Sequence, residues 1–150
     1  MLVEIIFRGS FSDTNWDFIR GFLSKSKRVY FNIPEIDLSI SFDVVIDSMK
    51  SNYYFDLVIN TDFLEIKEKV IPQVFINITR NHNEVNILLF FDVNSLDEAS
   101  SQTNLDYLRD WAIQFEKEFR FEYFICQIDN AGDGEYFFDS KGIGKLYLLV

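Results

Sequence analysis

The sequence predicts an α+β domain, in which a mostly antiparallel sheet of about seven or eight strands is covered by two helices. Apolar and polar residues alternate with a period of two along several segments, and two other segments have the apolar spacing of amphipathic helices. No Pro- or Gly-rich linker divides the chain. Of its 150 residues, 48% are hydrophobic and 17% are aromatic, so we expect residues 1–150 to form a single domain with one large core.

The first predicted strands lie in the N-terminal half of the chain. Residues 1–8 lack the basic leader and cleavage site of a secretory signal, and we expect them to form the first strand. Residues 36–47 alternate most clearly, with an apolar side chain at every second position and mainly Asp or Ser between them. The alternation resumes in residues 55–60, which we expect to pair with residues 36–47 as a hairpin. The outer face of this hairpin is predicted to be acidic.

Further strands are predicted in the second half. Residues 74–79 and 85–91 flank a polar, Asn-rich turn and are expected to form a second hairpin. Because residues 87–91 have no polar alternation, we expect a central strand that is covered on both faces. The remaining strand candidates are residues 122–128, 135–139 and 145–150.

Two segments are predicted to be helices. Residues 16–23 have apolar side chains at helical spacing, and they follow three residues that can cap a first turn, Asp13, Thr14 and Asn15. Residues 105–119 carry a longer apolar stripe, for which Thr103 or Asn104 can be the cap. Basic residues near the end of this second segment suit the negative pole of a helix.

Residues suited to catalysis are scarce. The one histidine, His82, lies in the predicted polar turn, where we expect it to be solvated rather than to act as a base. The one cysteine, Cys126, lies in an apolar strand and is expected to be buried and inert. The sequence contains no Cys/His cluster for zinc and no glycine-rich phosphate-binding motif. We therefore expect a protein that is not an enzyme and that has no cofactor.

A loop at residues 129–135 superficially matches a calcium-binding loop, because Asp129 and Asp133 are followed by Gly134 at the sixth position. However, Ala131 stands at the third position and Ser140 at the twelfth, where an EF-hand has oxygen ligands. Strand-like segments also replace the flanking helices. We therefore predict a turn here and no metal site.

The net charge of −10, from 24 acidic and 14 basic residues, is the strongest functional signal. Most of the acid lies in residues 35–68 and 92–139, whereas basic residues gather near the first predicted helix. A negative surface repels nucleic acid and anionic lipid but attracts a basic protein. We expect no direct binding of nucleic acid or membrane, and no apolar run is long enough to span a bilayer. Solubility alone is the alternative explanation of this charge.

Residues 129–147 combine carboxylates with aromatic rings, a mixture that suits a protein interface. The segment ends in Gly142-Ile143-Gly144-Lys145-Leu146-Tyr147. At these residues the chain resembles the small acidic immunity proteins of bacterial polymorphic-toxin and contact-dependent growth inhibition systems. The resemblance implies a cytoplasmic inhibitor without a cofactor, which binds a cognate toxin domain tightly and blocks it. In such systems the toxin is often a basic nuclease.

The leading hypothesis is thus a cytoplasmic immunity protein whose acidic surface blocks a cognate basic toxin, with a nuclease as the expected class. One alternative is an acidic adaptor or nucleic-acid mimic that binds a basic nucleic-acid enzyme. Another is a small hydrolase that uses carboxylates, for which Glu4 and Asp92 are candidates because they lie in apolar runs. The expected partner-binding residues are Asp43, Asp47, Asp56, Asp92, Asp97, Glu98, Asp129, Asp133, Glu135, Tyr136 and Asp139.

Overall fold

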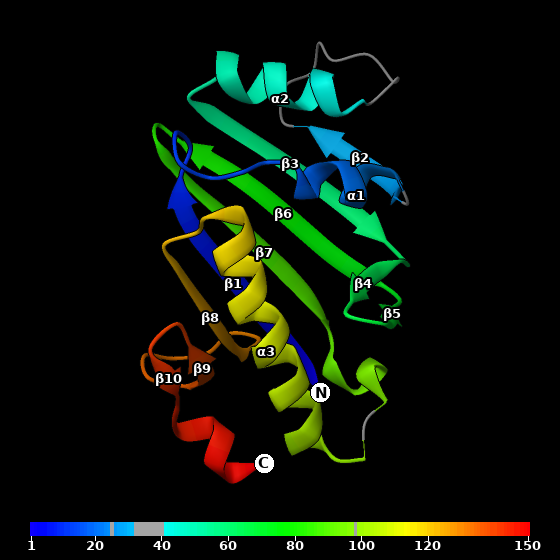
Figure 1. The fold of residues 1–150 in the computed structure, drawn as a ribbon, viewed down its shortest axis with the longest axis vertical. Helices are drawn as coiled ribbons and strands as arrows, with labels where there is room; N and C mark the ends of the chain where they lie inside the picture. The colour runs from blue at the N-terminus through cyan, green and yellow to red at the C-terminus, as the bar shows by residue number, and fades with distance from the viewer. Residues whose placement is uncertain (25, 32–40, 98) are drawn as a thin grey trace.

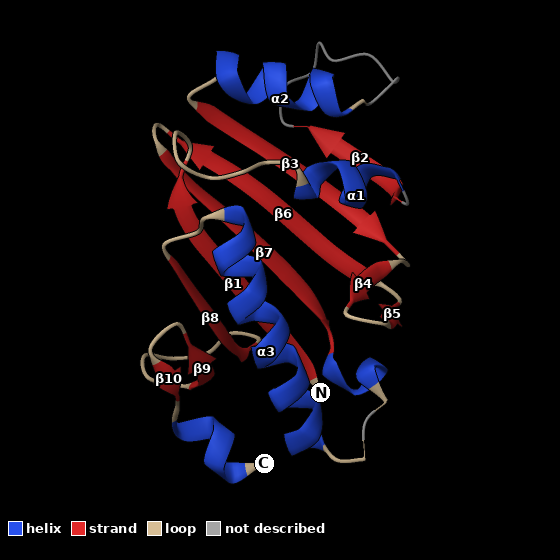
Figure 2. Ribbon diagram, viewed as in Figure 1, coloured by secondary structure: helices blue, strands red, loops and turns tan. Residues whose placement is uncertain are grey.

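The computed structural model describes residues 1–24, 26–31, 41–97 and 99–150. Within these ranges the main element is an eight-stranded antiparallel sheet with the order β10-β9-β8-β1-β7-β6-β3-β2 (Figures 1 and 2). This confirms the predicted α+β class with a mostly antiparallel sheet. The strands are β1 (Leu2–Ser10), β2 (Ser26–Phe31), β3 (Tyr54–Thr61), β6 (Val74–Asn81), β7 (Glu84–Asp92), β8 (Tyr123–Ile128), β9 (Tyr136–Asp139) and β10 (Gly142–Ile143). A separate two-stranded hairpin consists of β4 (Leu64–Ile66) and β5 (Lys69–Ile71).

Three α-helices occur in the described part of the chain, α1 (Phe18–Ser24), α2 (Phe42–Ser51) and α3 (Ser101–Phe119). Helices α1 and α3 lie across one face of the sheet, and α2 lies at the end where β3 begins (Figure 2). Two short 3-10 helices, η1 (Val93–Leu96) and η2 (Lys145–Leu149), follow β7 and β10. The two predicted helices correspond to α1 and α3, and α2 was not predicted.

The ends of α3 differ slightly from the prediction. Its cap is Ser100, whose hydroxyl accepts a hydrogen bond from the Thr103 backbone N–H at 3.2 Å. The helix therefore begins before the predicted caps at Thr103 or Asn104. Arg120 ends it in the left-handed conformation, with a φ of 59°.

Phe7 on β1 lies at the centre of the aromatic part of the core. Its ring centroid is 5.9 Å from that of Trp111 and 4.7 Å from that of Phe115, both on α3. It also lies 5.5 Å from the ring of Phe121 and 5.8 Å from that of Phe124. One side chain thus connects the first strand, the long helix and β8.

The predicted second hairpin is confirmed as β6 and β7, which turn at His82 and Asn83. Strand β7 is central, as predicted, because it pairs with both β1 and β6. Ile87 and Leu89 are fully buried against the helices, whereas Leu88 and Phe90 on the opposite face are only half-buried. Full cover on both faces is therefore not found in the described chain.

The predicted strand at residues 36–47 is wrong where it can be examined. Residues 32–40 lie outside the described residues, and the rest belongs to α2. Ser41 caps this helix, its hydroxyl accepting from the Val44 N–H at 3.3 Å. Val45 and Met49 are fully buried, because the apolar positions also repeat at helical spacing. The hairpin expected with residues 55–60 does not form, and β3 pairs with β2 and β6 instead.

The predicted strand at residues 145–150 is also wrong. Residues 142–143 form the short β10, and the chain then continues as η2. The backbone of Gly144 passes close to β9, since its N–H donates to the Phe137 carbonyl at 2.7 Å. Leu148 and Leu149 are 73% and 79% exposed, so this apolar segment does not form a buried strand.

Candidate functional site

The predicted partner-binding residues fall into separate groups and do not lie on one face. Asp43, Asp47 and Asp56, here called the α2 acidic group, lie on α2 and near the start of β3. Asp129, Asp133, Glu135 and Asp139, the β8–β9 acidic group, lie toward the other end of the molecule together with Tyr136 (Figure 1). Asp92 is the last residue of β7, Asp97 follows η1, and Glu98 lies outside the described residues.

The α2 acidic group is presented by a helix and a strand. Asp43 and Asp47 are exposed and stand one turn apart on the outer side of α2, because Val45 and Met49 face the core. Asp56 lies on the face of the sheet opposite the buried Phe55 and Leu57, where its carboxylate accepts a hydrogen bond from the side-chain amide of Asn77 on β6.

Two side chains of the β8–β9 acidic group form hydrogen bonds within the fold, and the other two are exposed. The Glu135 carboxylate accepts from the Gly132 N–H at 2.9 Å, and Asp139 accepts from the Lys141 N–H at 2.8 Å. These two side chains therefore stabilise the turns before and after β9. Asp129 and Asp133 are exposed in the turn that precedes β9.

Asp92 and Asp97 stabilise the turn that leaves β7. The N-terminal amino group donates to Asp92 at 2.7 Å, and this hydrogen bond holds the pKa of the carboxyl below its ordinary value. Asp97 adopts the left-handed conformation and donates its N–H to the Asn94 carbonyl at 3.0 Å. Asp92 pairs with Leu2 and Ile128 pairs with Val3, at the start of β1. Asp92 therefore lies at the same end of the sheet as Asp129, which follows Ile128.

The loop at residues 129–135 is a turn, as predicted, because β8 ends at Ile128 and β9 begins at Tyr136. Among the described residues, no group of three or more His, Cys, Asp or Glu side chains is arranged to hold a metal ion.

None of the helices in the described ranges combines the length and apolar character needed to cross a bilayer.

Cys126 is buried in β8, as predicted, and burial raises the pKa of its thiol. We expect a thiol reagent at neutral pH to label the native protein at least about 100-fold more slowly than the urea-unfolded chain, because labelling requires opening of the sheet. Mass spectrometry of timed samples measures both rates. Equal rates in the two states would contradict the buried position.

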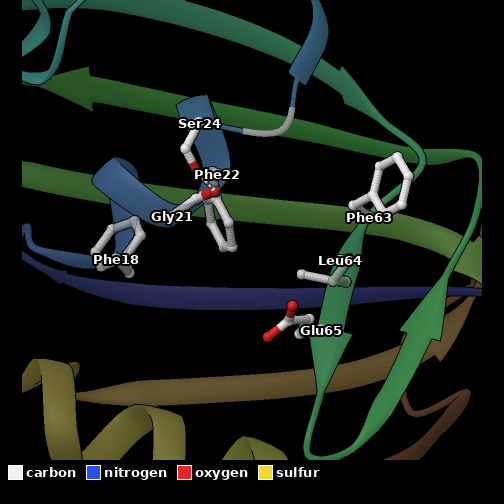
Figure 3. Close-up of a pocket in the computed structure, with 7 residues that line it drawn as sticks. All are labelled: Phe18, Gly21, Phe22, Ser24, Phe63, Leu64 and Glu65. Carbon is white, nitrogen blue, oxygen red and sulfur yellow. Dashed lines mark hydrogen bonds between the residues drawn. The ribbon is translucent and has the colours of Figure 1, made fainter.

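Two hollows in the described part of the structure give no support to the hydrolase alternative. One hollow, of about 180 Å³, lies between α1 and β4, and Figure 3 shows the residues that line it. Its lining is mostly apolar, with the rings of Phe18 and Phe22 on one side and Glu65 as its one carboxylate. A second hollow, beside Val74, also has one carboxylate, Asp62. Neither brings together the pair of carboxyl groups that glycoside hydrolysis requires.

An exposed aromatic cluster that was not predicted lies near the start of β3. It is formed by Tyr53, Tyr54 and His82 and is here called the aromatic tip. Each tyrosine is 64% exposed. The His82 ring stacks on Tyr53 with 5.9 Å between centroids and meets Tyr54 edge-on at 5.1 Å. The Tyr54 hydroxyl lies 2.9 Å from Nε2 of His82. Two adjacent tyrosines before an alternating segment were the available signal, but the pairing of β3 with β6 was needed to place them beside His82.

Comparisons with known proteins identify the family. The PABL017 Cdi1I immunity protein family matches residues 2–142. A chain in a crystal structure of the toxic C-terminal tip of CdiA from Pseudomonas aeruginosa in complex with immune protein has a similar fold, with a TM-score of 0.74, 20% identity and 97% of each chain covered. No curated protein sequence gives a significant match. The resemblance to immunity proteins is therefore confirmed over nearly the whole sequence, and the chain belongs to the PABL017 Cdi1I immunity protein family.

Proposed function

We propose that this immunity protein binds the C-terminal toxin domain of its cognate CdiA protein in the cytoplasm and blocks that domain through an acidic surface. The observation that carries this proposal is the family match over residues 2–142. The net charge of −10 supports the further proposal that the toxin is basic, as expected of a nuclease that must approach phosphates.

Inhibition by occupancy needs a complementary surface but no reactive group. Exposed carboxylates would attract a basic toxin over distances near the Debye length, about 10 Å at 0.1 M salt, and so speed association. Two exposed pairs lie at the two ends of the molecule, Asp43 and Asp47 on α2 and Asp129 and Asp133 in the turn before β9. They provide matched double variants, each with the same change of charge.

The test is binding of the purified C-terminal domain of the CdiA protein encoded immediately upstream. We expect a complex whose association rate falls steeply with salt. Of the double variants Asp43→Lys/Asp47→Lys and Asp129→Lys/Asp133→Lys, the one at the contact should reduce the association rate at low salt by about tenfold or more, and the other by less than about twofold. Stopped-flow measurements at low salt and near 0.5 M salt check this.

Two outcomes separate the parts of the proposal. If no complex forms, and cells that express the toxin domain are not protected, the proposed partner is wrong. If a complex forms with an association rate that neither salt nor either double variant changes, the partner is correct but the acidic contact is wrong.

A further inference from the structure

We propose that the aromatic tip, Tyr53, Tyr54 and His82, is the anchor of the toxin contact and receives a Lys or Arg side chain of the toxin. This inference rests on the proposed function and adds to it the surface that is used and the chemistry that it recognises. Tyrosines that combine a large apolar face with a hydroxyl are enriched at the centres of protein interfaces.

The tip is continuous and spans the end of the sheet. Tyr53, just before β3, lies on the same side as the buried Phe55, whereas Tyr54 lies on the opposite side with Asp56. His82, in the β6–β7 turn, contacts both rings. The two exposed tyrosine rings are thus joined through the His82 ring into one surface, whereas most exposed apolar side chains of a protein stand singly.

A buried arginine holds this surface in place. Arg80 is only 8% exposed, and its guanidinium carbon lies 3.8 Å from the centroid of the Phe11 ring and 5.2 Å from that of Tyr53. Its Nε donates to the His82 carbonyl at 2.6 Å, and one of its terminal nitrogens donates to the carbonyl of Met49 at the end of α2. The same cation thus fixes α2, the β6–β7 turn and one ring of the tip.

The backbone adds to this rigidity. The His82 N–H donates to the Tyr53 carbonyl at 2.8 Å, and His82 holds the left-handed conformation with a φ of 53°. The Asn83 carbonyl accepts from the Phe11 N–H at 2.7 Å. Because the rings are ordered before binding, less conformational entropy is lost when a partner docks.

The surroundings of the tip are acidic. Asp47 lies on the last turns of α2, Asp56 follows Tyr54 on the same side of β3, and Glu84 begins β7. Asp13 accepts from the hydroxyl of Ser10, the residue that pairs with Glu84. Lys50 contributes one exposed positive charge at the end of α2. Aromatic faces beside carboxylates fit a guanidinium or an ammonium group, which gains both cation–π and ionic interactions.

The experiment measures the dissociation constant of the complex with the C-terminal domain of the cognate CdiA protein. We expect Tyr53→Ala and Tyr54→Ala to raise this constant about 30-fold or more, as is typical of interface hot spots. Phe63→Ala and Leu148→Ala remove other exposed apolar side chains, which are 53% and 73% exposed, and should change it by less than about threefold. Thermal unfolding of each variant verifies the fold.

Two further variants test the recognition of a cation. Tyr54→Phe keeps the aromatic face and should bind within about fivefold of the wild type, whereas Tyr54→Leu keeps apolar area without that face and should lose about tenfold. If Tyr54→Leu binds as tightly as the wild type, the assignment of a cationic side chain is wrong.

The outcomes distinguish this inference from the proposed function. If the wild-type protein does not bind the toxin domain, the proposed function fails. If the wild type binds and the folded tip variants bind equally well, the function stands and the inference is overturned. Should Tyr53→Ala not fold, Tyr54→Ala decides the result, because Tyr54 is exposed and lies on the face of the sheet opposite the buried Phe55.

Discussion

Replacement of Phe7 by alanine is expected to lower the free energy of unfolding by about 3–5 kcal/mol. Its ring is fully buried and contacts four other aromatic rings, contributed by α3, β8 and the turn before β8. Deleting it removes buried apolar area and leaves a cavity that large rings on three sides cannot readily fill.

Urea denaturation followed by circular dichroism measures the Phe7 effect, provided that the slope of the transition is unchanged. The control is Phe63→Ala, which removes the same side chain from a position that is 53% exposed and should cost less than about 1 kcal/mol. Similar losses for the two variants would show that Phe7 is not central to the core.

Replacement of Gly144 by alanine is expected to destabilise the protein by about 3 kcal/mol. A Cβ atom at this position would lie 2.3 Å from the backbone oxygen of Tyr136 and 2.6 Å from its ring. A change of rotamer cannot remove the contact with the backbone oxygen. The C-terminal segment must therefore move away from β9 and lose the hydrogen bond from Gly144 to Phe137.

Hydrogen exchange of residues 136–150, together with urea denaturation, measures the Gly144 effect. Gly21→Ala is the matched control, since Gly21 lies inside α1 and an added Cβ would meet nothing within 4 Å. That change should stabilise the protein by about 0.5–1 kcal/mol, because alanine favours the helix. A Gly144→Ala variant as stable as the wild type would contradict the close packing on β9.

The strands that the sequence predicted correctly are those whose alternation matches one buried face. In β6, Val74, Ile76 and Ile78 are buried and the residues between them are not, so period two is the dominant pattern. Residues 42–49 fit both the period of two of a strand and the period of 3.6 of a helix, because Phe42 and Ile46 belong to the apolar positions of either pattern. The Ser41 cap and the burial of Val45 and Met49 decide for the helix.

The candidate site was less predictable than the fold. Acidic positions can be read from the sequence, but their division between two ends of the molecule depends on strand order. The aromatic tip depends on a pairing between segments that are distant in the sequence, with Tyr54 opposite Asn81. No local sequence pattern indicates that β3 pairs with β6. The predicted hairpin instead paired residues 55–60 with residues 36–47.

The shortness of β10 affects which kinds of association are open to this protein. With two residues, Gly142 and Ile143, at that edge of the main sheet, a foreign strand finds almost no backbone ladder to extend. Gly144 and η2 then turn the chain away from the strand direction. This border is thereby protected from fibril-like self-assembly, and a protein that docks there must be recognised by its side chains rather than by main-chain hydrogen bonds, which any sequence can supply.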